Sequence, residues 1–275
     1  MREQNRNLVV RVVTALLLFP VAVWVTWLGG LPFALVVAAA AAISAAELVL
    51  MFERRLRPTG VLGIAVAALL PLAAWLGSRT GSLAPEWLGL AVSGAVIALL
   101  SAALLQEGPL EEAPRAAAIS ALAWAYAGVL PASVVGLRLR HGWQWVILLF
   151  VVSWLNDTLA YFAGRLWGKH KLAERISPKK TWEGFAGGAV GSVLGAAGVK
   201  LLFLPAVPLW ACVVMGLGGA VLGPMGDLAE SMLKRAAGVK DSGRIIPGHG
   251  GLLDRIDAVL FVAPWISACA LWLAR

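Results

Sequence analysis

The feature that most constrains the fold is a succession of long apolar runs separated by short charged segments. The hydrocarbon core of a bilayer is about 30 Å thick, so a helix needs about 20 apolar residues to cross it, and in lipid its backbone groups must bond within the segment. The chain has 60% hydrophobic and only 14% charged residues, a balance that is rare in water-soluble domains. We therefore expect an all-α integral membrane protein, a polytopic bundle of helices.

One transmembrane helix for each apolar run gives about nine. The runs cover residues 8–28, 31–52, 61–77, 86–105, 115–137, 143–163, 183–204, 209–228 and 256–273. The first run is too long for the core of a signal peptide and lacks a cleavage pattern, so we expect it to remain as an anchor. Neither a repeat nor a low-complexity linker divides the chain, which predicts one membrane domain, 1–275.

The distribution of Lys and Arg predicts the orientation. With the N-terminus in the cytoplasm, all but five of the 23 Lys and Arg fall in cytoplasmic segments, the exceptions being Arg79, Arg138, Arg140, Arg275 and the intramembrane Lys200. This pattern satisfies the positive-inside rule. A basic face beside anionic headgroups also accounts for the net charge of +8, so we expect membrane lipid and no nucleic acid as a partner.

Glycine recurs every four residues at Gly187, Gly191 and Gly195, and again at Gly219 and Gly223. Small residues at this spacing let helix backbones approach closely in lipid. We therefore expect tight helix packing at these positions.

Ionisable residues divide the chain into two halves. The first five spans contain few of them, Glu47 being the main one, and 1–142 are interpreted as mainly scaffold helices. In the second half, Asp157, Asp227, Glu230, Asp254 and Asp257 lie in or beside spans, where a charge costs roughly 2.5–3.5 kcal/mol. Residues 143–275 are therefore expected to hold the catalytic helices and cytoplasmic loops.

The spacing of these acids predicts a metal site. Residues three apart share a helix face, so Asp227 lies beside Glu230, and Asp254 lies beside Asp257. Carboxylates gathered in this way can hold Mg²⁺ beside a phosphate. Five cations close by in sequence suit a substrate with several phosphates: Lys234, Arg235, Lys240, Arg244 and Arg255. The alternative is that the charges only pair with one another at the membrane surface.

Two segments offer further anion contacts. The glycine-rich segment 238–251 can bring backbone N–H groups close to a phosphate, and His249 within it could act as an acid, a base, a phosphate donor or a structural hydrogen-bonding group. In the basic segment 164–184, Ser177 followed by proline predicts a helix N-cap, with Lys179 and Lys180 beside an anion-binding helix end. The alternative for this segment is a loop that only sets topology.

The stretch SMLKRAAGVKDSGRIIPGHGGLLDRID, residues 231–257, resembles the signature of the phosphatidate cytidylyltransferase (CDP-diacylglycerol synthase) family. NDTLAYFAGRLWGKHK, SPKKTWEG and GDLAESMLKR also look like that family. The resemblance implies transfer of CMP from CTP to phosphatidic acid, with Mg²⁺ as the cofactor. A second metal ion is left open. We further expect the protein to lie in a bacterial cytoplasmic membrane, with its active site facing the cytoplasm. Whether it forms a homodimer is left open.

We assign roles to the matching residues as hypotheses. Asp227 and Asp254 are the first choice of metal ligands, followed by Asp257 and Asp241. The residues expected in the catalytic site are Asp227, Lys234, Arg235, Lys240, Asp241, His249, Asp254, Arg255 and Asp257. Those expected to contact substrate are Asn156, Asp157, Lys179, Lys180, Ser231, Gly250 and Gly251.

Two other functions compete with this interpretation. A CTP-dependent polyprenol or lipid-alcohol kinase would transfer a phosphoryl group and release CDP. An ion-coupled transporter would place its carboxylates near the bilayer midplane in broken helices, whereas these cluster at the cytoplasmic ends of the predicted spans.

Overall fold

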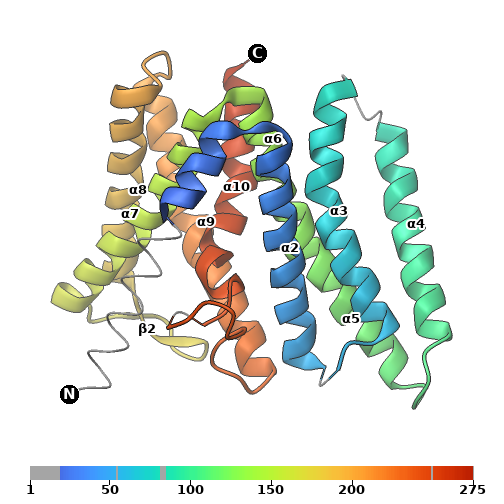
Figure 1. The fold of residues 1–275 in the computed structure, drawn as a ribbon. Helices are drawn as coiled ribbons and strands as arrows, with labels where there is room; N and C mark the ends of the chain where they lie inside the picture. The colour runs from blue at the N-terminus through green and yellow to red at the C-terminus, as the bar shows by residue number, and fades with distance from the viewer. Residues whose placement is uncertain (1–18, 54, 81–84, 249, 275) are drawn as a thin grey trace. The chain divides into compact units, whose positions relative to one another are not determined.

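The chain is almost wholly helical (Figure 1). The computed structural model describes residues 19–53, 55–80, 85–248 and 250–274, so most of the first apolar run and His249 lie outside the described residues. A short apolar helix, Phe19–Leu28, precedes α2. The elements that follow are α2 (Gly30–Phe52), α3 (Pro58–Thr80), α4 (Pro85–Leu104), α5 (Glu112–Trp124), the π-helical η1 (Ala125–Val129), α6 (Leu130–His141), α7 (Trp143–Trp167), β1 (Lys171–Ala173), β2 (Ser177–Thr181), α8 (Trp182–Phe203), α9 (Leu209–Ala236) and α10 (Leu253–Leu273).

Seven helical segments in the described part of the chain are long and apolar enough to cross a membrane. One of them is the continuous run through α5, η1 and α6. The expectation of an all-α integral membrane protein is confirmed. The number of spans and the cytoplasmic N-terminus stay predictions.

The chain divides into two compact units. The first comprises the described part of Met1–Leu139 together with Val239–Arg255, and the second comprises Arg140–Gly238 together with Ile256–Arg275. The predicted single membrane domain with a division at residue 142 stays a prediction. The loop before α10 packs with the N-terminal helices in the first unit.

In the first unit, α2, α3 and α5 pack against one another (Figure 1). Small residues bring their backbones close: a Cβ added to Gly128 would lie 2.7 Å from Ala67 Cα. Gly128 lies in the π-helical turn η1, an irregularity that changes which side chains face α3.

In the second unit, α7 packs along α8. The predicted glycine stripe forms this interface, since a Cβ added to Gly187 or Gly191 would meet the main-chain carbonyls of Leu159 or Leu155. Gly195 faces Val151 and Leu155 of α7. The prediction of tight packing at these glycines is confirmed.

The predicted N-cap at Ser177 is wrong. Ser177–Thr181 is the strand β2, which pairs antiparallel with β1, and α8 begins at Trp182. A residue before proline favours extended backbone, so Ser177 begins a strand. Thr181 caps the helix, its hydroxyl accepting a hydrogen bond from Gly184 N–H at 3.1 Å.

Candidate active site

A pocket of about 450 Å³ lies in the second unit, between α7, the β1–β2 hairpin, the start of α8 and α9. It is lined by Asn156, Asp157, Ala160, Tyr161, Gly164, Arg165, Leu172, Ser177, Lys179, Lys180, Thr181, Gly184, Phe185, Pro224 and Asp227. Five of the residues predicted from the sequence to contact substrate or metal thus share one cavity.

An ion pair between Lys180 and Asp227 joins the hairpin to α9. Lys180 Nζ lies 2.7 Å from Asp227 Oδ2, and it donates a hydrogen bond to the Pro224 carbonyl at 3.1 Å. Lys180 comes from a strand and Asp227 from a helix 47 positions later. The pair therefore fixes a cation and an anion in the wall of the pocket.

Asp227 belongs to a larger group of acids. Ser231, one turn later on α9, donates a hydrogen bond to Asp227 Oδ1 at 3.2 Å. The negative charges of Asp157 and Asp257 interact unfavourably with that of Asp227. A Cβ on Gly226 would lie 2.5 Å from the carbonyl oxygen of Asp257, so glycine allows α10 to approach α9 beside Asp227. Three helices thereby contribute carboxylates to one region.

Asn156, which lines the same pocket, is a buried polar side chain. The side chain is 1% exposed, and its Nδ2 donates to Ser192 Oγ at 3.0 Å. Ser192 in turn donates to the Val152 carbonyl at 3.3 Å. Among the described residues, Asn156 Oδ1 has no hydrogen-bond partner. Buried polar atoms are nearly always satisfied, so this oxygen is an exception in the wall of the pocket.

Lys234 and Glu230 form a second ion pair on α9. Lys234 Nζ lies 2.6 Å from Glu230 Oε2, and the Glu230 side chain is only 1% exposed. The charge of Lys234 also interacts favourably with Asp257. Lys234 is therefore electrostatically linked to the acids of the second unit, and its phosphate role stays a prediction.

The donor set of these acids suits Mg²⁺. In the described part of the chain, no three His, Cys, Asp or Glu side chains already form a metal-binding group. Mg²⁺ usually keeps several waters and takes one or two carboxylates together with substrate phosphates. Asp227, Asp157 and Asp257 repel one another when ionised, which a divalent cation would relieve.

In the first unit, Asp254 accepts hydrogen bonds from the loop that precedes α10, which we call the signature loop (residues 239–248 and 250–252). Asp254 Oδ2 accepts hydrogen bonds from Ser242 N–H at 2.9 Å, Ser242 Oγ at 3.0 Å and Gly251 N–H at 2.9 Å. Gly250 adopts φ +88°, a left-handed conformation that favours glycine. One oxygen of this predicted metal ligand is thus used to shape the loop.

Sequence reasoning missed a second acid at this loop. Glu47 of α2 is 4% exposed, and its carboxylate accepts hydrogen bonds from Ser242 Oγ, Leu252 N–H and Leu253 N–H. The available signal was an ionisable residue inside an apolar span, which is a candidate functional residue by default. We had instead interpreted the N-terminal half as scaffold.

The remaining predicted residues lie in or beside the loop. Arg235 is in the last turn of α9, Lys240 and Asp241 follow it, and Arg255 is in the first turn of α10. Their assignments, that of Gly251 and that of His249, which lies outside the described residues, stay predictions.

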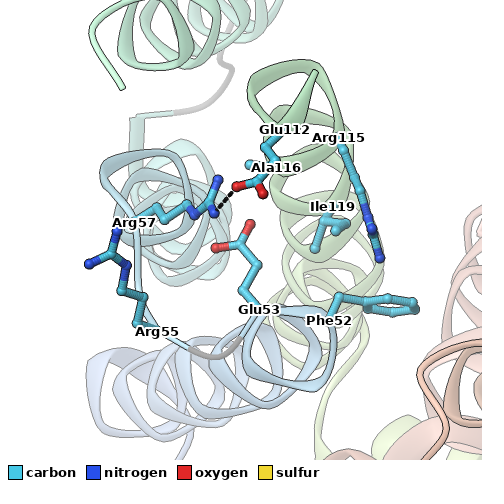
Figure 2. A pocket seen from close by; sticks show the side chains of 8 residues that line it. All are labelled: Phe52, Glu53, Arg55, Arg57, Glu112, Arg115, Ala116 and Ile119. Atoms are coloured by element: carbon cyan, nitrogen blue, oxygen red, sulfur yellow. Dashed lines mark hydrogen bonds and ion pairs between the residues drawn. The ribbon is translucent and has the colours of Figure 1, made fainter. Parts of the chain in front are cut away.

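A larger pocket of about 550 Å³ lies in the first unit and contains none of these residues. Figure 2 shows Arg57 paired with Glu112 and the Glu53 carboxylate directed toward that pair, with Arg55 and Arg115 on opposite sides. Burial raises the pKa of the Glu53 carboxyl, against the opposing influence of Arg57 and Arg115. The Arg57–Glu112 ion pair in this pocket joins the α2–α3 connection to α5.

Known proteins resemble this chain over nearly its whole length. The model of the Cytidylyltransferase family matches residues 9–272. The chain belongs to this family. A phosphatidate cytidylyltransferase of Brucella abortus biovar 1 (strain 9-941) is 35% identical over 269 residues, which cover 94% of this chain and 91% of the relative.

A second family member, a phosphatidate cytidylyltransferase of Staphylococcus saprophyticus, is 47% identical over 128 residues, covering 46% of this chain and 49% of the relative. The family resemblance predicted from residues 231–257 is confirmed.

Proposed function

We propose that this cytidylyltransferase transfers CMP from CTP to phosphatidic acid, producing CDP-diacylglycerol and pyrophosphate. The observation that carries the proposal is the Lys180–Asp227 ion pair in a pocket that is also lined by Asp157 and Asn156. Phosphatidate cytidylyltransferase relatives that match most of the chain support this substrate pair.

In the reaction, a phosphate oxygen of phosphatidic acid attacks the α-phosphorus of CTP. The new P–O bond replaces the bond between the α-phosphorus and the bridging oxygen, and pyrophosphate leaves with that bond's electrons. Both reactants are anionic, so the protein must neutralise charge and align the two phosphates. The attacking phosphate is already largely ionised near neutral pH, so no strong general base is needed.

We propose that lysines of the second unit hold phosphate. Lys179 and Lys180 line the pocket, and Lys234 lies on α9 beyond Asp227. Lys180 is already paired with Asp227, so we propose that it contacts substrate and keeps this carboxylate in place. Asn156 would accept a hydrogen bond from a ligand group.

We propose Mg²⁺ as the cofactor, with Asp227 and Asp257 as ligands and Asp157 beside them. Bound there, the cation would offset the negative charge of the triphosphate. That Asp254 adds a further ligand stays a prediction. So does a second metal ion.

We place the enzyme in a bacterial cytoplasmic membrane with this pocket on the cytoplasmic side. The distribution of Lys and Arg supports that orientation. CTP would arrive from water, while phosphatidic acid would move laterally with its acyl chains in lipid. A homodimer stays a prediction.

Purified protein with CTP, Mg²⁺ and phosphatidic acid in micelles tests the proposal. Mass analysis should show CDP-diacylglycerol and one pyrophosphate for each CTP consumed. Parallel reactions replace phosphatidic acid by diacylglycerol or polyprenol. Phosphorylation of either alcohol with release of CDP would assign the chain to lipid-kinase chemistry instead. Ion flux in sealed vesicles without CTP would favour a transporter.

A further inference from the structure

Glu47 is a buried acid of α2, in the half of the chain that lacks the signature. Its side chain contacts residues that are about 200 positions away in sequence. The Leu252 and Leu253 N–H groups each donate to one of its two oxygens at 2.9 Å. Both N–H groups belong to the start of α10, where a helix has no internal acceptors for them. Glu47 therefore acts as the N-terminal cap of α10 from another helix.

Ser242 links this cap to Asp254. The hydroxyl lies 3.1 Å from Glu47 Oε2 and 3.0 Å from Asp254 Oδ2. A hydroxyl has one hydrogen, so the two carboxylates share a single donor. A change at Glu47 consequently changes the hydrogen bonding of Asp254 without contacting it directly.

Two glycines of the loop leave room for the Glu47 side chain. A Cβ added to Gly243 would collide with Glu47 Oε1, and one added to Gly251 would lie 2.7 Å from Glu47 Oε2. The backbone of the loop can approach the carboxylate this closely only because both positions lack a side chain. These two glycines therefore have a structural role, contact with Glu47, that does not involve binding phosphate.

We propose that Glu47 is a positioning residue for cytidylyl transfer: it fixes the loop of residues 239–252 and the start of α10, and through Ser242 it orients Asp254. The inference rests on the proposed function. It assigns a part in the reaction to an N-terminal helix, whose contribution is to order the signature and not to touch substrate.

Glu47→Gln is the direct test, because the amide keeps the shape of the side chain and replaces one acceptor by a donor that faces backbone N–H groups. We expect kcat to fall about 10- to 100-fold, the range seen when groups that orient active-site ligands are removed. Hydrogen–deuterium exchange should become faster in peptides covering 240–253 and stay unchanged in α7 and α8.

Ser44→Ala is the matched control. Ser44 lies one turn earlier on α2, is fully buried, and its hydroxyl has no hydrogen-bond partner among the described residues. We expect its kcat and loop exchange to equal those of the parent. A double-mutant cycle of Glu47→Gln with Ser242→Ala should be non-additive, because the two side chains share one hydrogen bond.

Parent-like kcat or parent-like loop exchange in Glu47→Gln would overturn the proposal, as would strict additivity in the cycle. If Glu47→Gln does not fold, Ser242→Ala decides by the same two measurements. The exchange readout does not depend on catalysis. A parent protein that is inactive with phosphatidic acid therefore contradicts the proposed function, whereas an active parent with an indifferent Glu47 contradicts only this inference.

Discussion

At the scale of single residues, Asp227 is the centre of the account. It holds Lys180 on one oxygen and Ser231 on the other, and it interacts with the charges of Asp157 and Asp257. Its neighbours come from β2, α7 and α10 as well as α9. Removing its charge should therefore disturb catalysis far more than folding.

We expect Asp227→Asn to lower kcat about 10²- to 10³-fold, the loss typical when a group that stabilises transition-state charge is removed. The melting temperature in detergent should stay close to that of the parent, since asparagine preserves shape. Glu107→Gln, an exposed acid of the first unit, serves as control and should retain parental kcat. Equal activity of the two variants would remove Asp227 from the site.

The sequence predicted individual residues of the pocket better than their partners. Asp157 and Asp227 are predicted because charges in apolar surroundings need a reason. Lys179 and Lys180 are predicted from an expected helix end beside them. The contact between Glu47 and the loop was not predictable, since no local pattern connects residues about 200 positions apart. The hydrogen bonds that Asp254 accepts from backbone N–H groups of its own loop were not predicted either.

At the scale of elements, the α7–α8 interface was foreseen and the hairpin was not. Four-residue glycine spacing has one common physical reason in lipid, which is close helix packing. By contrast, β1 and β2 have three and five residues, too few for a period-2 pattern within a basic loop. The hairpin nevertheless carries Lys180, so its absence from the prediction hid the ion pair to α9.

Gly191→Ala tests the interface. The added Cβ would collide with the Leu155 carbonyl, and overpacking a tight contact costs about 1–3 kcal/mol. We expect a lower melting temperature. Gly198→Ala on the same helix meets nothing within 4 Å and should leave stability unchanged or raise it, because alanine favours a helix over glycine. Similar destabilisation of both variants would argue against the packing role.

The pocket at the α2–α3 connection predicts a pH dependence. Burial raises the pKa of Glu53, so its ionised form destabilises the folded protein, fully above the raised pKa and progressively less as the pH falls through it. Glu53→Gln has no such charge. It should be more stable than the parent at neutral pH, and the difference in melting temperature should shrink toward pH 4. A difference that grows on acidification would contradict the assignment.

At the scale of the whole molecule, the chain is an integral membrane protein of the Cytidylyltransferase family. Composition alone predicted this class because so many apolar residues have no core to fill in a protein of this size. The prediction of its orientation rests only on the distribution of Lys and Arg. That distribution biases membrane insertion statistically and leaves no imprint on side-chain packing.

Labelling with an impermeant maleimide tests the orientation. In a background of Cys212→Ser and Cys269→Ser, we expect Arg175→Cys, in the turn between β1 and β2, to react only from the cytoplasmic side. Arg79→Cys, near the end of α3, should react only from the opposite side. The reverse pattern would place the active-site pocket outside the cytoplasm.

The most direct test of the central claim is the fate of labelled phosphorus from CTP. Purified protein with phosphatidic acid and Mg²⁺ receives CTP labelled at either the α- or the γ-phosphate. We predict that the α-label enters the lipid fraction and the γ-label appears in pyrophosphate, both at a rate that Asp227→Asn reduces. Transfer of the γ-label to lipid, or no labelled lipid from either CTP, would contradict the account.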